Sequence, residues 1–264
     1  MTVVRLIGLP TDSHSSFMRG PAQAPDPIRS ALASDHGNSA SELGPELGRD
    51  IHLQDLGNLP LDESPGDFDR IRAAASAAAE RATPIFLGGD HMVTYPIVAG
   101  LAQVHGPINI LHFDAHSDIY DDFEGDPLSH ASPFARIMEQ GLAKRLVQVG
   151  IRTLNAHCRE QARRFGVEVI EMRNFAVDAV PLLQAPLYIS LDLDALDPAF
   201  APGVSHHEPG GLSTREILSV LHRVGGPIVG ADVVEYNPTR DVNGVTAVVA
   251  AKFVKELAAM TAAR

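Results

Sequence analysis

Acidic and histidine side chains recur at short spacings where a hydrophobic segment of the chain ends. Residues 110–113 are mostly apolar and run directly into Asp114-Ala-His116-Ser-Asp118. Side chains two residues apart in an extended chain share a face, so we expect Asp114, His116 and Asp118 to point the same way. Two carboxylates and an imidazole are costly inside a core but are good ligands for a metal ion.

A second acidic pair ends the alternating segment 186–194. Its leucines and isoleucine fall on one face, and the opposite face carries Tyr188, Ser190, Asp192 and Asp194. Two carboxylates at this spacing on a hydrophobic strand repel each other and lose hydration together. A shared cation is the usual remedy, so this segment also predicts a metal site.

A third motif, Gly88-Gly-Asp-His91, follows the strand-like residues 84–87, and its glycines allow a sharp bend. The three motifs supply four carboxylates and two imidazoles as candidate ligands: His91, Asp114, His116, Asp118, Asp192 and Asp194. Six oxygen-rich ligands exceed the needs of one structural zinc, and the only cysteine is Cys158. They favour two hard or borderline ions, Mn²⁺ best, about 3.5–4 Å apart and activating a shared water.

The elements that must position these motifs alternate regularly along the chain. Strands are predicted at 3–9, 51–56, 84–87, 107–113, 145–151, 167–171, 186–192 and 227–233. Helices are predicted up to residue 33 and at 67–81, 94–104, 132–140, 156–165, 176–184, 213–223 and 243–260. This alternation implies a parallel sheet covered on both faces, with ligands beyond the carboxyl ends of the strands. All three metal motifs fall at such ends, which supports one common site in a single domain, residues 1–264.

Composition narrows the class of function. The 264 residues are 45% hydrophobic and carry a formal net charge of −12. This charge argues against nucleic acid and anionic membranes as partners, and it suits a cationic substrate. A single cysteine excludes an internal disulfide framework. Residues 1–8 enter a strand without the features of a signal peptide, and no apolar run reaches about 18 residues, so we expect a cytoplasmic protein.

The motifs GGDH at 88–91, DAHSD at 114–118 and SLDLDALDP at 190–198, in this order and spacing, resemble the arginase/agmatinase (ureohydrolase) family. The resemblance runs from about residue 3 to the C-terminus. It is closest to plant-type arginases, in segments 14–17, 129–132, 134–138, 201–205 and 232–238. It implies a three-layer α/β/α arginase-like fold with a mostly parallel central sheet, and a metal-dependent hydrolase that cleaves a guanidinium group to urea and an amine.

The resemblance also implies how the ligands are shared between two Mn²⁺ ions per chain. The residues that match Asp114 and Asp192 bridge the two ions. Those that match His91 and Asp118 complete one ion, and those that match His116 and Asp194 complete the other. Met92 departs from the serine that usually follows GGDH, which changes the hydrogen bonding behind the ligands.

Four residues receive roles in the reaction from the same resemblance. Asp118 orients the attacking water-derived nucleophile, and Glu235 in the segment DVVEYNP binds the guanidinium. His130 in the segment SHAS moves protons, because a histidine titrates near neutral pH. Asn155 belongs to the loop that approaches the α-carbon end of the substrate.

Several alternatives stay open at this stage. L-arginine, giving L-ornithine, is the leading substrate, whereas agmatine, giving putrescine, or another guanidino acid is the alternative. The acidic segment 121–126 favours agmatine if it lines the pocket mouth. A single-zinc deacetylase and a non-catalytic metal scaffold are more distant alternatives. His112 is interpreted as a core histidine, His206 and His207 as residues of the substrate mouth or of the solvated surface, and the assembly as a homo-oligomer, a trimer or hexamer.

Overall fold

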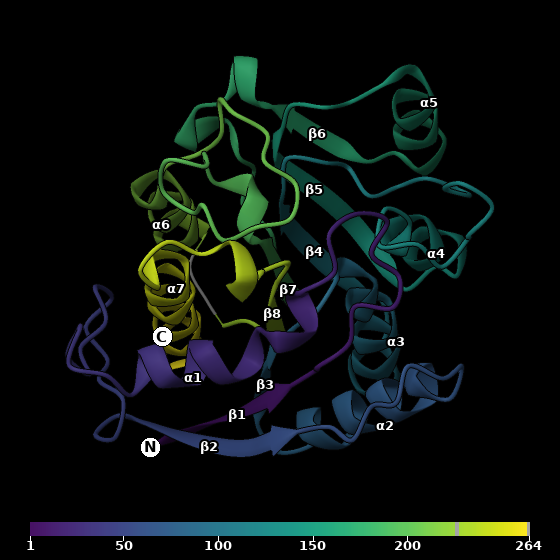
Figure 1. Cartoon of the computed structure of the whole chain (residues 1–264). Coiled ribbons are helices and arrows are strands. Elements are labelled where there is room, and N and C mark those ends of the chain that lie inside the picture. The colour runs from purple at the N-terminus through teal and green to yellow at the C-terminus, as the bar shows by residue number, and fades with distance from the viewer. Residues whose placement is uncertain (225–226, 263–264) are drawn as a thin grey trace.

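The computed structural model describes residues 1–224 and 227–262, and its centre is one eight-stranded sheet (Figure 1). The strands lie in the order β2-β1-β3-β8-β7-β4-β5-β6, and all of their pairings are parallel. Their bounds are β1 Thr2–Gly8, β2 Ile51–Asn58, β3 Thr83–Leu87, β4 Ile108–Phe113, β5 Ala143–Ile151, β6 Glu168–Glu171, β7 Leu187–Asp192 and β8 Gly230–Val234. This arrangement confirms the predicted parallel sheet.

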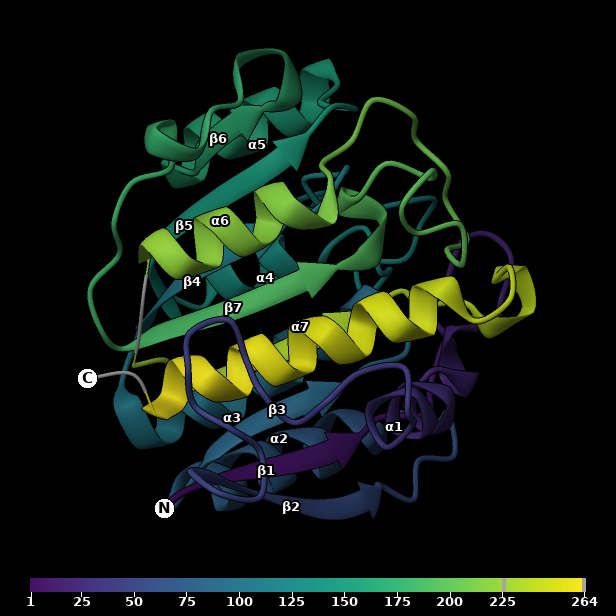
Figure 2. The same cartoon turned by 90° about the vertical axis from the view of Figure 1, so that its left-hand side faces the viewer.

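Helices cover both faces of this sheet, as the alternation predicted. Their bounds are α1 Pro25–Leu32, α2 Asp67–Ala79, α3 Thr94–His105, α4 Pro133–Glu139, α5 Ala156–Phe165, α6 Thr214–Val224 and α7 Val245–Ala262. Helices α1, α6 and α7 contribute to one hydrophobic cluster, and α2 to α5 contribute to the other. Figure 2 shows α6 and α7 lying across one face of the sheet. The fold is therefore the expected three-layer α/β/α sandwich.

The strands in the middle of the sheet are almost wholly apolar. Every residue of β4, β7 and β8 is buried, because these strands have helices on both sides. In β7, Ile189 and Leu191 join one cluster, whereas Tyr188 faces the other. Strands β3, β8, β7 and β4 are consecutive neighbours and run parallel. The loops that follow them therefore meet at the carboxyl-terminal end of the sheet.

One predicted element is wrong. Residues 176–184 form no α-helix, and this stretch holds only a single 3-10 turn, Val177–Ala179. Pro181 lies in the middle of the predicted helix, where a proline removes a backbone donor and clashes with the preceding turn. Buried Val180 and Leu183 attach the segment to the core instead. Strand β8 also begins at Gly230, three residues after the predicted start at 227.

No helix in residues 1–224 or 227–262 is long and apolar enough to cross a lipid bilayer.

Candidate active site and metal centre

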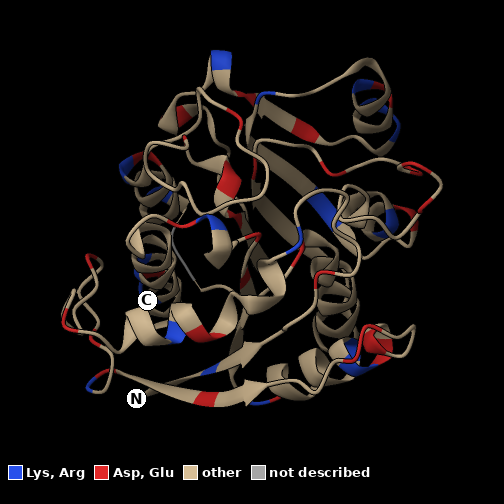
Figure 3. Ribbon diagram, viewed as in Figure 1, with Lys and Arg blue, Asp and Glu red and all other residues tan. Residues whose placement is uncertain are grey.

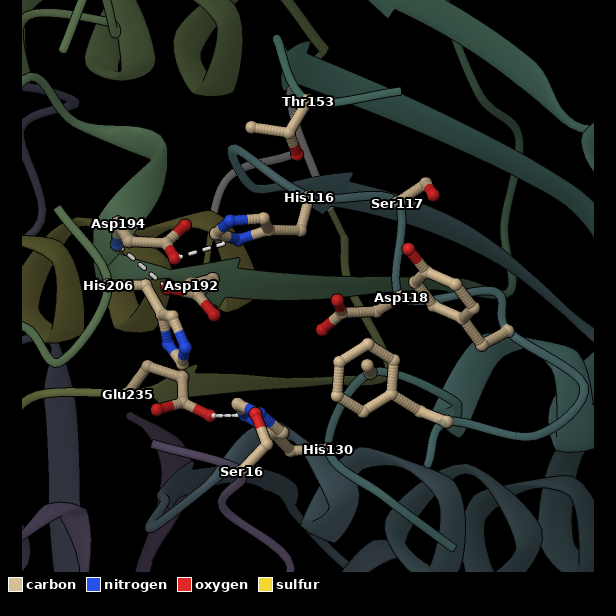
Figure 4. Close-up of a pocket in the computed structure, with 13 residues that line it drawn as sticks. Ser16, His116, Ser117, Asp118, His130, Thr153, Asp192, Asp194, His206 and Glu235 are labelled. Atoms are coloured by element: carbon tan, nitrogen blue, oxygen red, sulfur yellow. Dashed lines mark hydrogen bonds and ion pairs between the residues drawn. The ribbon is translucent and has the colours of Figure 1, made fainter. Parts of the chain in front are cut away.

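The six predicted ligands converge at the carboxyl ends of three strands, β3, β4 and β7. Figure 4 shows four of them, His116, Asp118, Asp192 and Asp194. His91 begins the 3-10 turn His91–Val93 after β3, and Asp114 directly follows β4. Asp192 is the last residue of β7, and Asp194 lies in the turn Leu193–Ala195 that follows. The structure therefore brings together side chains that are up to about a hundred residues apart in the sequence.

The first ligand group consists of the His91 ring and three carboxylates around it. Its Nδ1 atom lies 3.2 Å from Asp114 Oδ2, 3.1 Å from Asp118 Oδ2 and 3.2 Å from Asp192 Oδ2. All four side chains are buried, and His91 Nδ1 has no hydrogen-bond partner. A nitrogen with at most one proton cannot serve three carboxylates, whereas one cation can bind all four atoms.

A second group shares Asp114 with the first. His116 Nδ1 lies 3.0 Å from Asp194 Oδ2 and 3.3 Å from Asp114 Oδ1. Asp114 thus presents one carboxylate oxygen to each group, which is the arrangement that a carboxylate bridging two ions requires. Asp192 belongs to the first group only, so its predicted bridging role stays a prediction.

Turns, rather than an extended strand, produce this convergence. The strand ends at Phe113, and Asp118 has a positive φ of 46°, so the simple alternation expected for residues 114–118 does not persist. Asp194 is held by two bonds. Its backbone N–H donates to Asp192 Oδ1 at 2.7 Å, and its Oδ1 accepts from the Ala115 N–H at 3.1 Å.

The glycines of the first motif serve close packing rather than an unusual backbone angle. A Cβ atom on Gly89 would lie 1.6 Å from Thr11 O, and one on Gly88 would lie 2.4 Å from a methyl carbon of Val234. No side chain fits these spaces, so glycine lets β3 leave the sheet beside β8 and brings His91 to the other ligands.

The donor set fits a pair of divalent cations. Asp114, Asp118, Asp192 and Asp194 are each at most 7% exposed, and four ionised carboxylates match the charge of two divalent ions. Burial, together with the charges of Asp194 and Asp114, raises the pKa of Asp192 well above its usual value. Ligands bound at about 2.0–2.2 Å and at right angles lie about 3 Å apart, which agrees with the distances around His91.

A buried hydrogen-bond chain fixes the orientation of His91. Its Nε2 lies 3.0 Å from Ser190 Oγ, and that hydroxyl donates to Asp232 Oδ1 at 2.8 Å. Tyr188 and Thr94 hydroxyls donate to the other oxygen of Asp232. Because Ser190 gives its proton to Asp232, His91 Nε2 must donate to Ser190, which leaves Nδ1 unprotonated and able to bind a cation.

The metal-ligand motifs did not predict this hydrogen-bond chain, although the sequence carries a signal for it. Tyr188 and Ser190 share the polar face of β7 with Asp192, and Asp232 belongs to the segment that carries Glu235. His112 is buried as predicted, but it also contacts a ligand. Its Nε2 lies 2.9 Å from Asp114 Oδ2, and Gln148 holds the other ring nitrogen at 3.1 Å.

Glu235 and His130 form a buried pair beside the metal cluster. His130 Nδ1 lies 2.8 Å from Glu235 Oε1, and the same oxygen accepts the His91 backbone N–H at 2.9 Å. Glu235 Oε2 is buried and has no partner. Burial lowers the pKa of His130, but the neighbouring charge and hydrogen bond of Glu235 outweigh this effect and raise it to about 9.

Both groups open onto one cavity of about 220 Å³. Its lining includes Asp118, Asp194, His130, His206 and Glu235, and aromatic rings from residues 120 and 123 (Figure 4). The predicted metal ligands and the predicted guanidinium site therefore face the same space, which suits a small substrate.

Asn155 does not line this cavity in the described structure. Its Oδ1 caps α5 by accepting the Cys158 N–H at 2.9 Å, and its Nδ2 donates to Tyr120 OH at 2.5 Å. Thr153, two residues earlier in the same loop, lines the cavity instead. Direct contact of Asn155 with a substrate stays a prediction, and this conformation does not favour it.

The three residues whose roles were open in the sequence have separate positions. His206 lines the cavity, whereas exposed His207 places its Nε2 2.7 Å from Pro202 O. Met92 is buried in the apolar cluster beneath α2 to α5, and its backbone N–H donates to Asp90. Where the family usually has a serine hydroxyl after GGDH, this chain therefore has an apolar contact.

Comparisons with known proteins agree with this geometry. A family sequence model described as "Arginase family" matches residues 2–260. The chain is similar to "Arginase 1, mitochondrial" of Arabidopsis thaliana, with 51% identity over 96% of this chain and 80% of the relative. It is 34% identical to "Agmatinase, mitochondrial" of Gallus gallus over 95% of this chain and 78% of the relative. The solved structure "Arginase from Medicago truncatula" superposes with a TM-score of 0.91 at 44% identity, covering 100% of this chain and 88% of that one.

We predict that Asp114→Ala and Asp192→Ala each lower the bound metal. The lost carboxylate removes a ligand from a buried group and lowers the negative charge that attracts the cations. Elemental analysis after dialysis should give about two ions per chain for the wild type and one or none for either variant. Asp69→Ala, in an exposed aspartate of α2, is the matched control and should keep the wild-type content. Full metal content in both ligand variants would contradict the assignment.

Proposed function

The chain belongs to the arginase family, and from this premise we propose that it hydrolyses the guanidinium group of L-arginine, giving L-ornithine and urea. The arginase names and the roughly half identity of the plant relatives support arginine as the substrate. We further propose that residues 1–264 form one ureohydrolase domain, since the family sequence model spans nearly all of them.

The observation that carries this proposal is the free carboxylate oxygen of Glu235. One oxygen is engaged by His91 and His130, whereas Oε2 is buried without a donor beside the metal cluster. A buried acceptor without a partner is costly, and a guanidinium supplies the missing charged N–H donors. Glu235 has a positive φ of 61°, a conformation that few non-glycine residues adopt and that is common at functional sites.

We propose that two Mn²⁺ ions are held by the two ligand groups that share Asp114. His91, Asp118 and Asp192 complete one group, and His116 and Asp194 complete the other. When bound, the ions supply a nucleophile from water near neutral pH and balance the ligand charge. The oxygen-rich donor set favours Mn²⁺.

The protein's own residues position and protonate the substrate. Glu235 Oε2 holds the guanidinium next to the ligand cluster, which supplies proximity and charge balance. The Asp118 carboxylate lines the cavity, where it can accept a hydrogen bond from the attacking water. His130 lies at the same wall, and its raised pKa keeps a proton on the ring at neutral pH for the leaving amine.

The acidic side chains of segment 121–126 do not line the cavity. Asp121 lies 3.0 Å from the His157 ring, Asp122 accepts the Gly125 N–H at 2.6 Å, and Asp126 lies 3.2 Å from the His14 ring. Figure 3 shows this acidic loop at the outer edge of the molecule. From the same segment, Phe123 lines the cavity but the aspartates do not. The main argument for agmatine is therefore weakened, and arginine remains the proposed substrate.

Two further properties stay proposals. A homo-oligomer, a trimer or hexamer, is carried over from the family resemblance alone. The cytoplasmic location predicted from the sequence also stays a prediction, and the plant relatives carry mitochondrial or chloroplastic locations in their names.

We predict that Glu235→Gln retains its metal but loses most activity. The neutral amide cannot balance the guanidinium charge, and breaking a charged contact in a desolvated site costs about 2–5 kcal/mol in kcat/KM. Urea release from L-arginine and metal content should be measured together. Glu208→Gln, in an acid close in sequence to His206 but outside the cavity lining, is the control. Unchanged kinetics in a folded Glu235→Gln variant would remove this residue from the site.

We predict that His130→Asn lowers kcat by about 10²–10⁴ with little change in KM, because a positioned proton donor is lost. In the wild type the protonated form is active, so kcat/KM, which reports the free enzyme, should fall as the pH rises through the His130 pKa of about 9. That descending limb should be absent in the variant. His52→Asn, in an exposed histidine of β2, should behave like the wild type. A variant with the wild-type rate and pH profile would contradict the role.

We predict that L-arginine has a higher kcat/KM than agmatine or 4-guanidinobutyrate at one fixed Mn²⁺ concentration. Asp121→Asn and Asp122→Asn should change the arginine-to-agmatine ratio by less than about twofold, because these acids face solvent where salt screens them. If agmatine exceeds arginine by about tenfold, or 1.4 kcal/mol, the choice of arginine is wrong.

A further inference from the structure

We propose that His206 is a specificity-determining residue whose imidazole packs against the guanidinium-bearing arm of the substrate. The inference rests on the proposed function, because it assigns one wall of the same cavity. His206 belongs to the segment between β7 and α6, and it lines the cavity together with Glu235 and Asp192. Figure 4 shows its ring drawn between these two acids, on the opposite side of the cavity from Asp118.

The segment that carries His206 is held on both sides, so the ring has a defined position. Ser205 Oγ donates to Met18 O at 2.7 Å and accepts from Asn237 Nδ2 at 2.9 Å. Arg152 Nε donates to Glu208 O at 2.9 Å, and the same guanidinium donates to Asp194 O at 2.7 Å. These bonds connect the His206 segment to the turn that carries a metal ligand.

Aromatic neighbours support the His206 ring from several directions. The Phe17 ring centroid lies 5.5 Å away and covers it from the loop that follows β1. His130 lies 5.3 Å away and His116 lies 5.7 Å away. His206 therefore stands between the proposed proton donor and a proposed metal ligand, with Phe17 fixing it in place.

The chemistry of the cavity explains what such a ring contributes. Glu235 and the metal cluster can meet the N–H edges and the carbon of a guanidinium, but its flat faces need cover. Within the described residues, no lysine or arginine lines the cavity, so no long basic side chain competes with the substrate for Glu235 there. Guanidinium groups stack on aromatic faces, and the His206 ring lines the same cavity as Glu235, whose free oxygen would hold one.

The test compares His206→Ala, His206→Phe and His206→Asn in the Mn²⁺-loaded enzyme. Phenylalanine keeps a flat ring without hydrogen-bonding atoms, whereas asparagine keeps hydrogen bonding without the ring. His207→Ala is the matched control, because its side chain is exposed outside the cavity lining. Kinetics with L-arginine, metal content, and calorimetric titration with methylguanidine are measured for every variant.

Removing the ring should lower kcat/KM for arginine and weaken methylguanidine binding by about fivefold to thirtyfold in both His206→Ala and His206→Asn. His206→Phe should stay within about threefold of the wild type, since the stacking surface remains. His207→Ala should stay within about twofold, and metal content should not change in any variant. A parallel loss in kinetics and in methylguanidine affinity locates the contact at the guanidinium itself.

Three results with the variants overturn the inference. In the first, His206→Ala matches the wild type. In the second, His206→Asn matches the wild type and His206→Phe resembles His206→Ala, which would mean that His206 acts through a hydrogen bond and not through packing. A loss with arginine but none with methylguanidine would place the contact at the far end of the substrate. The proposed function fails separately, if the wild type releases no urea from arginine. In that case the methylguanidine titrations still decide the role of His206, and a wild type that binds no methylguanidine overturns it.

Discussion

Repulsion among buried carboxylates is the constraint on which the rest of this structure depends. Asp114, Asp118, Asp192 and Asp194 converge in a volume that is almost closed to water. Like charges in such a place cannot all ionise without compensation, which cations at the centre would supply. A parallel sheet makes this arrangement possible, because the carboxyl ends of several strands lie side by side. The apolar residues of the same strands fill the core.

The guanidinium site and the metal cluster are joined through the backbone. The Glu235 N–H donates to Gly89 O at 2.9 Å, and Glu235 Oε1 accepts from the His91 N–H at the same distance. The strand end that carries a proposed metal ligand therefore also fixes the residue that we propose binds the substrate. A displacement of one site moves the other, so a substrate held by Glu235 keeps a constant position relative to the metal ligands.

The sequence predicted the fold and the clustering of the candidate ligands well because both depend on local pattern. Alternating strands and helices identified the parallel sheet, and the paired acids at strand ends identified the cluster. It failed where the local role of a residue was not recognised or where tertiary contacts decide. Pro181 prevents the predicted helix at 176–184, a turn at Asp118 replaces the expected extended segment, and Asn155 is engaged as a helix cap. The strand order, which makes β3, β8, β7 and β4 neighbours, has no local signal at all.

In the proposed mechanism, the carboxylate of Glu235 that pairs with His130 gives the proton transfer its direction. In the free site, His130 is the cation that compensates Glu235, and this pairing raises the pKa of its imidazole to about 9. A guanidinium that binds the free Oε2 brings a second positive charge to the same carboxylate. Like charge disfavours the protonated imidazole, so substrate binding lowers the His130 pKa from its resting value. The histidine thus becomes a stronger acid when the group that must receive its proton is in place, and substrate binding itself prepares the proton for the leaving amine.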